Sequence, residues 1–255
     1  MEFIQAIKGI QKAFGDKSVL KGIDVVFEDG KANLIIGRSG SGKTVFLKSI
    51  LGLHEVDNGV ILFDGRPLHE MDKKQRKALR QEIGMVFQGG ALFDSQTVEE
   101  NVLFPLNMFS DLTPAERKKR VDFCLERVNL TNANKLYPAE ISGGMQKRVA
   151  IARAISMNPK YLFCDEPNSG LDPETSIVID NLIREITVEY NITTIINTHD
   201  MNSVLEIGDH VVLMKEGFKV WEGSNDEVLT SQNEDVIDYV FKSNLFKKVR
   251  QALIK

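Results

Sequence analysis

A glycine-rich loop is the part of this sequence whose residue types and spacing point most directly to chemistry. It follows the apolar run Leu34–Ile36 and consists of Gly37, Arg38, Ser39, Gly40, Ser41, Gly42, Lys43 and Thr44. The spacing Gly-x-x-x-x-Gly-Lys-Thr between a strand and a helix is typical of loops whose backbone N–H groups surround a chain of phosphates. Glycine permits the tight turn, and the helix that follows directs its positive end at the anion. The sequence therefore predicts a nucleoside triphosphate site, with a glycine-rich turn that binds nothing as the alternative.

Charged and hydroxyl side chains could supply the chemistry of such a site. Lys43 would place a positive charge near the β- and γ-phosphates, and the Thr44 hydroxyl is placed to ligate Mg²⁺. Asp165 and Glu166 follow directly after the apolar run Tyr161–Cys164. A carboxylate at the end of a buried strand can bind Mg²⁺, and a second one can act as the general base for the attacking water. We expect these roles of Asp165 and Glu166, with two exposed acids in a turn as the alternative.

A third motif lies between the loop and the two acids. Ser142, Gly143, Gly144, Met145 and Gln146 precede a helical pattern that starts at Lys147. In order and spacing, the three motifs resemble those of ABC-type ATPases, and the resemblance extends from Phe14 to Gly223. Gln88 in Val-Phe-Gln, the run Ser169–Asp172 and His199 in Thr-His-Asp resemble the Q-loop, D-loop and H-loop of that family.

This resemblance implies ATP hydrolysis, with ATP and Mg²⁺ as cofactors, and a homodimer with two composite sites. Ser142 and the N–H groups at the start of its helix would close over the γ-phosphate held by the other subunit. The residues that it implies for catalysis are Lys43, Gln88, Glu166 and His199. Those that it implies for the metal are Thr44, Gln88 and Asp165.

The nucleotide contacts that the resemblance implies form a longer set. They are Phe14, Gly37, Arg38, Ser39, Gly40, Ser41, Gly42, Lys43, Thr44, Val45, Ser142, Gly143, Gly144 and Asp172. Phe14 occupies the position of an aromatic side chain that stacks on adenine in the family, and an ordinary core phenylalanine is the alternative. Asp172 would act across the dimer seam and would also cap a helix.

Apolar periodicity and turn signals predict the elements that position these residues. Short alternating runs from Phe3 to Glu28, broken at Gly15-Asp16 and Gly22, predict antiparallel strands. Further along, helices are expected at 46–53, 72–81, 113–129, 144–157 and 201–207 and after Asp172, and strands at 59–63, 83–87, 161–164, 193–197 and 210–214. Strands that alternate with helices predict a parallel sheet covered on both faces.

The length of 255 residues and the hydrophobic content of 42% favour one large domain with a substantial core. The expected fold is an α/β P-loop NTPase, that is, a RecA-like core with a parallel sheet, an N-terminal antiparallel β subdomain and an inserted α-helical subdomain. The core is expected at 1–88 and 160–235, the helical subdomain at 89–159 and a helical tail at 236–255. The tail could lie on a membrane surface, on a second subunit or on its own domain.

Other sequence features restrict the partners and the location. The net charge of −4 argues against an electrostatic binder of nucleic acid. No apolar run is long enough to span a bilayer, and the N-terminus does not resemble a signal peptide. Cys124 and Cys164 fit no metal spacing and are expected to be reduced thiols of a cytosolic protein. As the ATPase of a transporter, the chain is expected on the cytoplasmic face of the inner membrane.

Three details concern the transported molecule. Gly89–Phe93 follows Gln88, Asn101–Leu106 comes after it, and Met145 replaces the commoner Gln of the family. Together they resemble the ATPase subunits of Mla/Mce-type phospholipid transport systems, which maintain outer-membrane lipid asymmetry. The resemblance implies a multi-spanning permease, an Mce-domain lipid-binding protein and a groove for the permease formed by Leu92, Phe93 and Phe104. Burial of these three side chains in the helical subdomain is the alternative.

Two other functions stay open at this point. An ATPase subunit of an importer for amino acids, metals or other small solutes would have the same catalytic core. A soluble ABC-type ATPase without a transport role is disfavoured, because the span from Lys43 to Ser142 leaves no room for a long coiled-coil insertion. The departures from the family pattern at Ile141 and Asn168 do not touch the chemistry.

Overall fold

The computed structural model describes residues 4–241, so the segment 242–255 of the expected tail lies outside the described residues. The chain forms two compact units. Unit 1 contains the residues up to 71 and from 195 onward, and unit 2 contains residues 72–194. The expected helical subdomain, 89–159, falls within unit 2.

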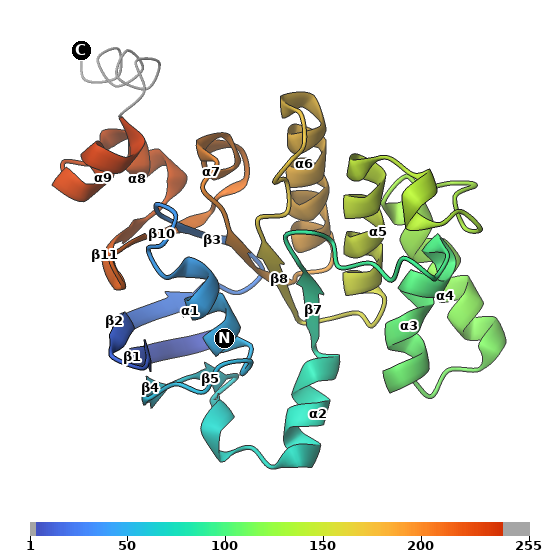
Figure 1. Ribbon diagram of the computed structural model, residues 1–255, viewed down its shortest axis with the longest axis horizontal. Coiled ribbons are helices and arrows are strands. Elements are labelled where there is room, and N and C mark those ends of the chain that lie inside the picture. The colour runs from blue at the N-terminus through green and yellow to red at the C-terminus, as the bar shows by residue number, and fades with distance from the viewer. Residues whose placement is uncertain (1–3, 242–255) are drawn as a thin grey trace. The chain divides into compact units, whose positions relative to one another are not determined.

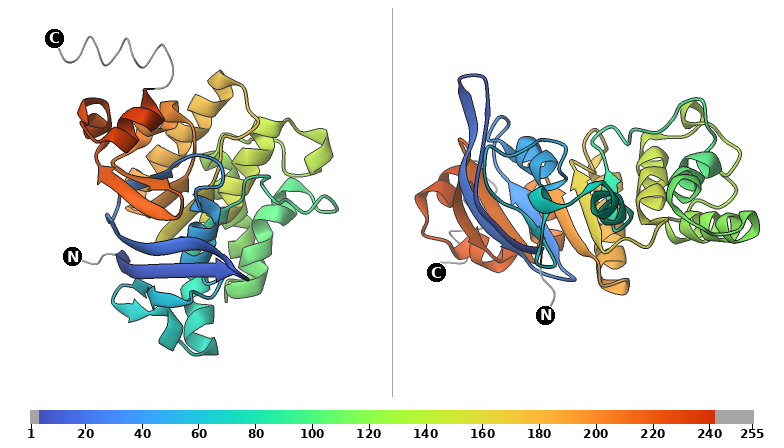
Figure 2. Two further views of the ribbon diagram at one scale, coloured as in Figure 1. Left: turned by 60° about the vertical axis from the view of Figure 1, so that its left-hand side comes forward. Right: turned by 90° about the horizontal axis from the view of Figure 1, so that it is seen from below.

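Unit 1 begins with the antiparallel sheet that the sequence predicts. Its strand order is β2-β1-β4, with β1 at Ile4–Phe14, β2 at Lys17–Phe27 and β4 at Asn58–Val60. The strands β1 and β2 lie side by side as a long hairpin in both views of Figure 2, and they are antiparallel throughout. Alternate residues of β2 are buried towards its end, where Ile23, Val25 and Phe27 enter the core. This alternation is the period-2 pattern of a sheet with one buried face.

The glycine-rich loop belongs to a second, mixed sheet of unit 1. Its strand β3 (Ala32–Ile36) pairs in parallel with β10 (His210–Lys215), and β10 pairs antiparallel with β11 (Phe218–Gly223). All five residues of β3 are buried, as expected for a strand covered on both faces. The strand β11 corrects the prediction of a wholly parallel sheet. Glu216 and Gly217 both have positive φ, as a two-residue hairpin turn with the right twist requires, and they return the chain beside β10.

The remaining elements of unit 1 are short. They are α1 (Lys43–Ile50), β5 (Leu62–Phe63), β6 (Arg66–Pro67), the 3₁₀ turn η1 (Leu68–Glu70), α7 (Met201–Ile207), α8 (Asn225–Thr230) and α9 (Glu234–Val240). The strand expected at 59–63 is in fact split into β4 and β5, and Asp64-Gly65 forms the turn to β6. The helix expected at 46–53 begins earlier, at Lys43, because the glycine-rich loop leads directly into its first turn.

Unit 2 combines two parallel strands with five helices. The strand β7 (Ile83–Val86) pairs in parallel with β8 (Tyr161–Asp165), and the helices are α2 (Lys73–Gln81), α3 (Val98–Phe109), α4 (Pro114–Arg127), α5 (Gly143–Ile155) and α6 (Pro173–Glu189). A 3₁₀ turn, η2, occupies Pro138–Glu140. The fully buried β9 (Thr193–Asn197) carries the chain from unit 2 into unit 1. The helices α3, α4 and α5 pack against one another, as Figure 1 shows.

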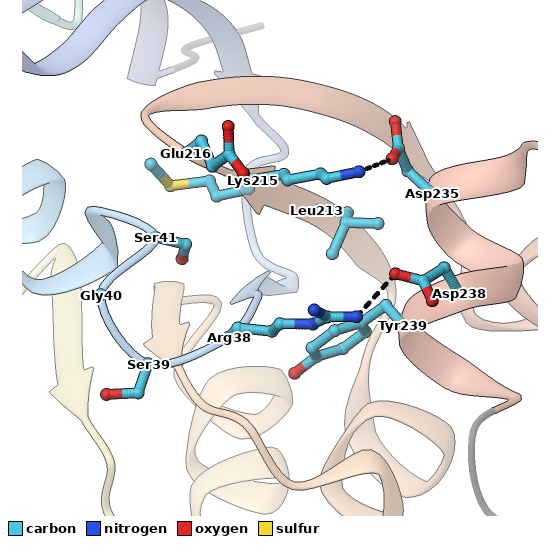
Figure 3. A pocket seen from close by; sticks show the side chains of 11 residues that line it. Arg38, Ser39, Gly40, Ser41, Leu213, Lys215, Glu216, Asp235, Asp238 and Tyr239 are labelled. Atoms are coloured by element: carbon cyan, nitrogen blue, oxygen red, sulfur yellow. Dashed lines mark hydrogen bonds and ion pairs between the residues drawn. The ribbon is translucent and has the colours of Figure 1, made fainter.

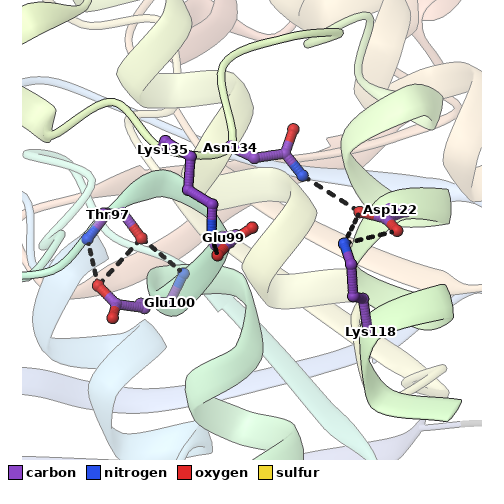
Figure 4. A network of polar contacts seen from close by, with 7 residues as sticks. All are labelled: Thr97, Glu99, Glu100, Lys118, Asp122, Asn134 and Lys135. Atoms are coloured by element: carbon purple, nitrogen blue, oxygen red, sulfur yellow. Dashed lines mark hydrogen bonds and ion pairs between the residues drawn. The ribbon is translucent and has the colours of Figure 1, made fainter. Parts of the chain in front are cut away.

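Capping boxes and surface pairs hold the ends of α3 and α4. Thr97 and Glu100 form a reciprocal capping box at the start of α3, and Thr113 and Glu116 form one at the start of α4. Figure 4 shows that Lys135 and Asn134, in the loop before η2, bond Glu99 of α3 and Asp122 of α4, and that Lys118 pairs with Asp122 within α4. The box at Thr113 and the proline behind it confirm the predicted start of α4. The sequence patterns did not predict α3 as a separate helix.

Candidate functional site

In unit 1, the loop from Gly37 to Gly42 joins β3 to α1, as the motif predicts. Gly37 has φ +149°, and a Cβ there would collide with the Met214 carbonyl oxygen of β10. Gly42 is the N-cap of α1 with φ +104°, a conformation that L side chains rarely adopt. The loop therefore needs glycine both for close packing on β10 and for the entry into α1.

The lysine and hydroxyl groups of the loop are held within unit 1. The Lys43 Nζ donates to the Gly37 carbonyl at 2.8 Å, and Lys43 is only 7% exposed. The Thr44 Oγ1 accepts a hydrogen bond of 3.3 Å from the Nδ2 of Asn197, the last residue of β9. The motifs do not include Asn197, although a buried amide at the end of an apolar strand is a signal that could have found it.

The side chain of Ser41 gives a further reason to expect a phosphate ligand at the loop. The Ser41 Oγ is buried, and among the described residues no hydrogen-bond partner meets it. A buried hydroxyl without a partner is costly, and a phosphate oxygen would accept its hydrogen bond. Since backbone N–H groups at a helix start and a lysine ammonium group also lie in this loop, the residues present suit a nucleotide phosphate chain.

A pocket of about 220 Å³ adjoins the loop on the side of α9 and is shown in Figure 3. Arg38 points into it, away from the loop, and pairs with Asp238 of α9 at 2.6 Å. Lys215 at the end of β10 pairs with Asp235 at the start of α9 at 2.5 Å. Arg38 is therefore engaged with α9, which its place in the motif did not suggest.

Three more of the expected nucleotide and catalytic residues lie in unit 1. Phe14 ends β1 and is 46% exposed, so it is not the core phenylalanine that the alternative describes. Its ring meets the edge of His54 at a centroid distance of 5.3 Å, and the Lys12 ammonium group lies above it. His199 is exposed in the short segment between β9 and α7. Val45 lies in the first turn of α1 and is half-buried.

Unit 2 carries the two acids. Asp165 is the last residue of β8 and is 7% exposed, while Glu166 follows it and is 8% exposed. The alternative of two exposed turn acids is therefore wrong. Glu166 has φ +50°, an uncommon backbone conformation for a residue with a side chain. Such outliers cluster at functional sites, where the surrounding structure holds them in place.

The motif at Ser142 forms the N-terminus of α5. The Ser142 Oγ caps this helix by accepting from the Met145 N–H at 3.3 Å, and Ser142 and Gly143 are exposed. A Cβ on Gly144 would lie 2.7 Å from the Thr175 side chain, so α5 approaches α6 closely here. Because Ser142 and Gly143 are exposed, an anion from another molecule can reach the start of α5.

Asp172 and Gln88 complete the expected set. Asp172 caps α6, and hydrogen bonds from the Thr175 hydroxyl and N–H groups hold the pKa of Asp172 below its usual value. Gln88 is exposed two residues after β7, and its carbonyl oxygen accepts a hydrogen bond from the Lys147 ammonium group of α5. Unit 1 thus contains the loop, Phe14 and His199, and unit 2 contains Gln88, Asp165, Glu166, Asp172 and the residues of the Ser142 motif.

Comparisons with known proteins agree with these motifs. The family profile of ABC transporters matches residues 20–169. The methionine import ATP-binding protein MetN 1 of Pseudomonas putida is 40% identical over 228 residues, which cover 89% of this chain and 68% of that protein. A probable ribonucleotide transport ATP-binding protein, mkl, of Mycobacterium leprae is 35% identical and covers 92% of this chain and 67% of its own length.

Solved structures give the same result for the fold. The structure of cbiO1 from Clostridium perfringens, part of the ABC transporter complex cbiONQ, superposes with a TM-score of 0.84 at 32% identity over the whole of both chains. The ATP-binding cassette MJ0796, solved as a dimer in a post-hydrolysis state with ADP and Pi, gives a TM-score of 0.78 at 31% identity and covers 86% of this chain and 98% of its own. Within residues 4–241, no helix has the length and apolar character needed to cross a bilayer.

Proposed function

The chain belongs to the ABC transporter family as an ATP-binding, ATP-hydrolysing subunit, and we propose that it powers a small-solute importer as a homodimer bound to a multi-spanning permease. The observation that carries this proposal is the 40% identity to a methionine import ATP-binding protein over 89% of the chain. Methionine or a similar amino acid is the first candidate for the solute. The chain would lie on the cytoplasmic face of the membrane that holds the permease.

Binding of ATP would use the glycine-rich loop. The N–H groups at the start of α1 and the Lys43 ammonium group would hold the phosphates, while Phe14, exposed at the end of β1, would stack on adenine. Thr44, Gln88 and Asp165 would hold Mg²⁺, which neutralises charge on the phosphate oxygens when bound. These three groups are a hydroxyl, an amide and a carboxylate, which are oxygen ligands that Mg²⁺ prefers.

Hydrolysis would depend on three further side chains. Glu166 would accept a proton from the attacking water, and Gln88 would orient that water. His199 would contact the γ-phosphate and keep the water and Glu166 in line. In the dimer, the Ser142 motif of the second copy and the start of its helix α5 would close over the same phosphate, so that each site needs both chains.

Isolation of the native complex tests the identity of the cargo. The tagged chain would be extracted from membranes of its host in mild detergent, and the proteins and lipids that co-purify would be identified by mass spectrometry. The importer proposal predicts a multi-spanning permease together with a solute-binding protein. It also predicts that methionine or a related solute stimulates ATP hydrolysis by the complex in vesicles. A complex with an Mce-domain protein and bound phospholipid would overturn this proposal.

Phospholipid transport is the second candidate, because of the segment after Gln88. Phe93 is 39% exposed, Phe104 is 36% exposed, and their ring centroids are 4.7 Å apart, while Leu92 beside them is half-buried. An exposed aromatic pair suits a permease contact better than the alternative of core packing. The relatives described above are named for methionine import and ribonucleotide transport, so the support for lipid remains the sequence pattern at Gly89–Phe93 and Met145.

A further inference from the structure

The segment from Gln88 to Phe93, here called the strap, is held by side chains that the motifs do not include. Lys147 of α5 donates to the Gln88 carbonyl oxygen. Arg153, near the other end of the same helix, donates to the carbonyl oxygens of Gly90 at 2.6 Å and Ala91 at 2.7 Å. The helix that begins at the Ser142 motif thus bonds three carbonyl groups of the strap.

The backbone of the strap is shaped to receive these bonds. Gly90 has φ +75° and Ala91 has φ +45°, and this left-handed pair is unusual because Ala91 carries a Cβ. At the far end, Asn101 of α3 is fully buried and accepts from the Phe93 N–H at 2.8 Å, while its Nδ2 donates to the Phe93 carbonyl at 3.2 Å. Hydrogen bonds from α5 and α3 therefore hold the main chain of the strap from Gln88 to Phe93.

Lys147 and Arg153 are both buried, and removing a charged side chain from water costs free energy unless hydrogen-bond acceptors surround it. Lys147 is 7% exposed and Arg153 is 8% exposed. Burial lowers the pKa of both groups, and for Lys147 the nearby Cys164 and Glu166 side chains act in the opposite direction. Burial of an ammonium group is tolerated only where acceptors compensate it. The Lys147 ammonium group is thus bonded to the main chain of Gln88 and lies within electrostatic range of Glu166.

We propose that Lys147 is a positioning residue for ATP hydrolysis, which acts by fixing the main chain of Gln88 to helix α5. The inference rests on the role proposed above for the Gln88 side chain at the water and the metal. Arg153 extends the same restraint to Gly90 and Ala91. Because Ser142 caps α5 and Lys147 lies in its second turn, a shift of this helix on dimer closure would move Gln88 with it. Neither Lys147 nor Arg153 touches the nucleotide in this scheme.

A double-mutant cycle on the purified full-length chain tests this inference. The variants are Lys147→Met, Gln88→Ala and the two combined, with Lys118→Met as the control because the pair of Lys118 with Asp122 on α4 is exposed. We expect Lys147→Met to lower kcat by roughly 10- to 100-fold, since a small displacement of a reacting group has an effect of that size. The KM for ATP should stay within about twofold, because the phosphate loop is intact. Lys118→Met should match the wild type.

The combined variant separates a positioning role from a structural one. If Lys147 acts through Gln88, Lys147→Met should lower kcat by less than about twofold in the Gln88→Ala background. Lys147→Arg, which keeps a charged donor, should restore most of the lost kcat. A full multiplicative loss in the combined variant would overturn the positioning role while leaving Gln88 in its proposed role. Wild-type kcat in Gln88→Ala would instead overturn the role of Gln88 itself, and the inference with it.

A second measurement covers the case in which Lys147→Met does not fold. Lys147→Gln is polar but shorter than lysine and uncharged, so it should weaken the bond to the Gln88 carbonyl, and it carries the same cycle. In this variant, amide hydrogen exchange at Gly89–Ala91 should rise while exchange in β8 stays as in the wild type. Unchanged exchange in the strap would contradict the proposal.

Discussion

At the level of single residues, Glu166 combines burial with an uncommon backbone conformation. It is 8% exposed with φ +50°, and its carbonyl accepts from the Ser169 N–H at 3.2 Å. This tight turn starts the segment that ends at Asp172, the cap of α6. The turn thus fixes the main chain from which the Glu166 side chain extends, which suits the general-base role proposed above.

The variant Glu166→Gln tests this assignment. The amide keeps the size of the side chain but accepts protons poorly, so kcat for ATP hydrolysis should fall by about 100-fold or more. Binding of ATP, measured by calorimetry, should remain close to that of the wild type, because the phosphate loop is unchanged. Near-wild-type hydrolysis would refute the general-base role.

The backbone conformation of the glycine-rich loop leads to a second prediction, which concerns Gly37. Gly37→Ala would place a Cβ against the Met214 carbonyl oxygen and force a strained φ of +149°. Strain of this kind costs about 1–3 kcal/mol, so urea unfolding should show a loss of stability in that range. Gly89→Ala is a matched control, since no atom lies within 4 Å of the place that its Cβ would occupy. Equal stability of the two variants would contradict the packing argument.

At the level of elements, the capping box of α4 links stability to pH. Hydrogen bonds from the Thr113 hydroxyl and N–H groups lower the pKa of Glu116 from 4.5. A carboxyl group with a lowered pKa in the folded state contributes stability above its unfolded pKa, and this contribution is lost as pH falls through the folded value. Thr113→Ala should therefore destabilise the protein at pH 7 and have a smaller effect at an acidic pH at which Glu116 is protonated. Urea unfolding at both pH values measures the difference, and an equal loss at both would contradict the link.

Helix α9 is attached both by an ion pair and by a buried apolar side chain, and we expect the two to contribute differently to stability. The Arg38–Asp238 pair has side chains that are 55% and 53% exposed, so its loss should cost less than about 1 kcal/mol. Val240, by contrast, is 2% exposed, and its truncation to alanine should cost about 2 kcal/mol. Asp238→Asn and Val240→Ala, compared by urea unfolding, test this ranking. A larger loss for Asp238→Asn would show that the ion pair, rather than packing, holds α9.

At the level of the whole molecule, the phosphate loop lies in unit 1 and the Ser142 motif in unit 2. If each active site combines the loop of one chain with the Ser142 motif of another, two inactive chains can complement each other. In a heterodimer of Lys43→Ala and Ser142→Arg, one site carries both changes and the other carries neither.

Mixing of these two variants tests the composite site. Each variant alone should lack ATPase activity, because every site of its dimer carries the change. An equal mixture should recover roughly a quarter of the wild-type sites if the chains pair at random. ATPase assays on the separate and mixed proteins measure this recovery. A mixture as inactive as its components would argue against sites shared between subunits.

The identity of the transported molecule could not be deduced from a few residue positions. Gly89–Phe93 and Met145 resemble a phospholipid transport subunit, whereas the relatives reported above carry names of methionine import and ribonucleotide transport. The proposed catalytic residues would bind nucleotide and metal whichever cargo is transported, so they do not select it. The proposed permease, which would select the cargo, is a separate subunit.

Local patterns were sufficient for most elements and for the main motifs. The glycine-rich loop, the capped start of α4 at Thr113 and the acids after β8 are contiguous in sequence, and each depends on interactions between near neighbours. By contrast, the sequence patterns did not define α3 as a helix of its own. The hairpin to β11 was missed because its signal is a single Glu216-Gly217 turn after a buried strand.

The amino-acid sequence alone was thus enough to identify an ATPase with a glycine-rich loop, paired acids and an α/β fold, because those features arise from short spacings. The folded structure was needed to show that Lys147 bonds the Gln88 carbonyl, that Arg153 bonds Gly90 and Ala91, and that Asn197 meets Thr44. Each of these bonds joins residues far apart in the chain, and each uses a backbone carbonyl or a hydroxyl that many side chains could meet. No spacing rule selects such partners, since packing of the helices and strands alone brings them within bonding distance.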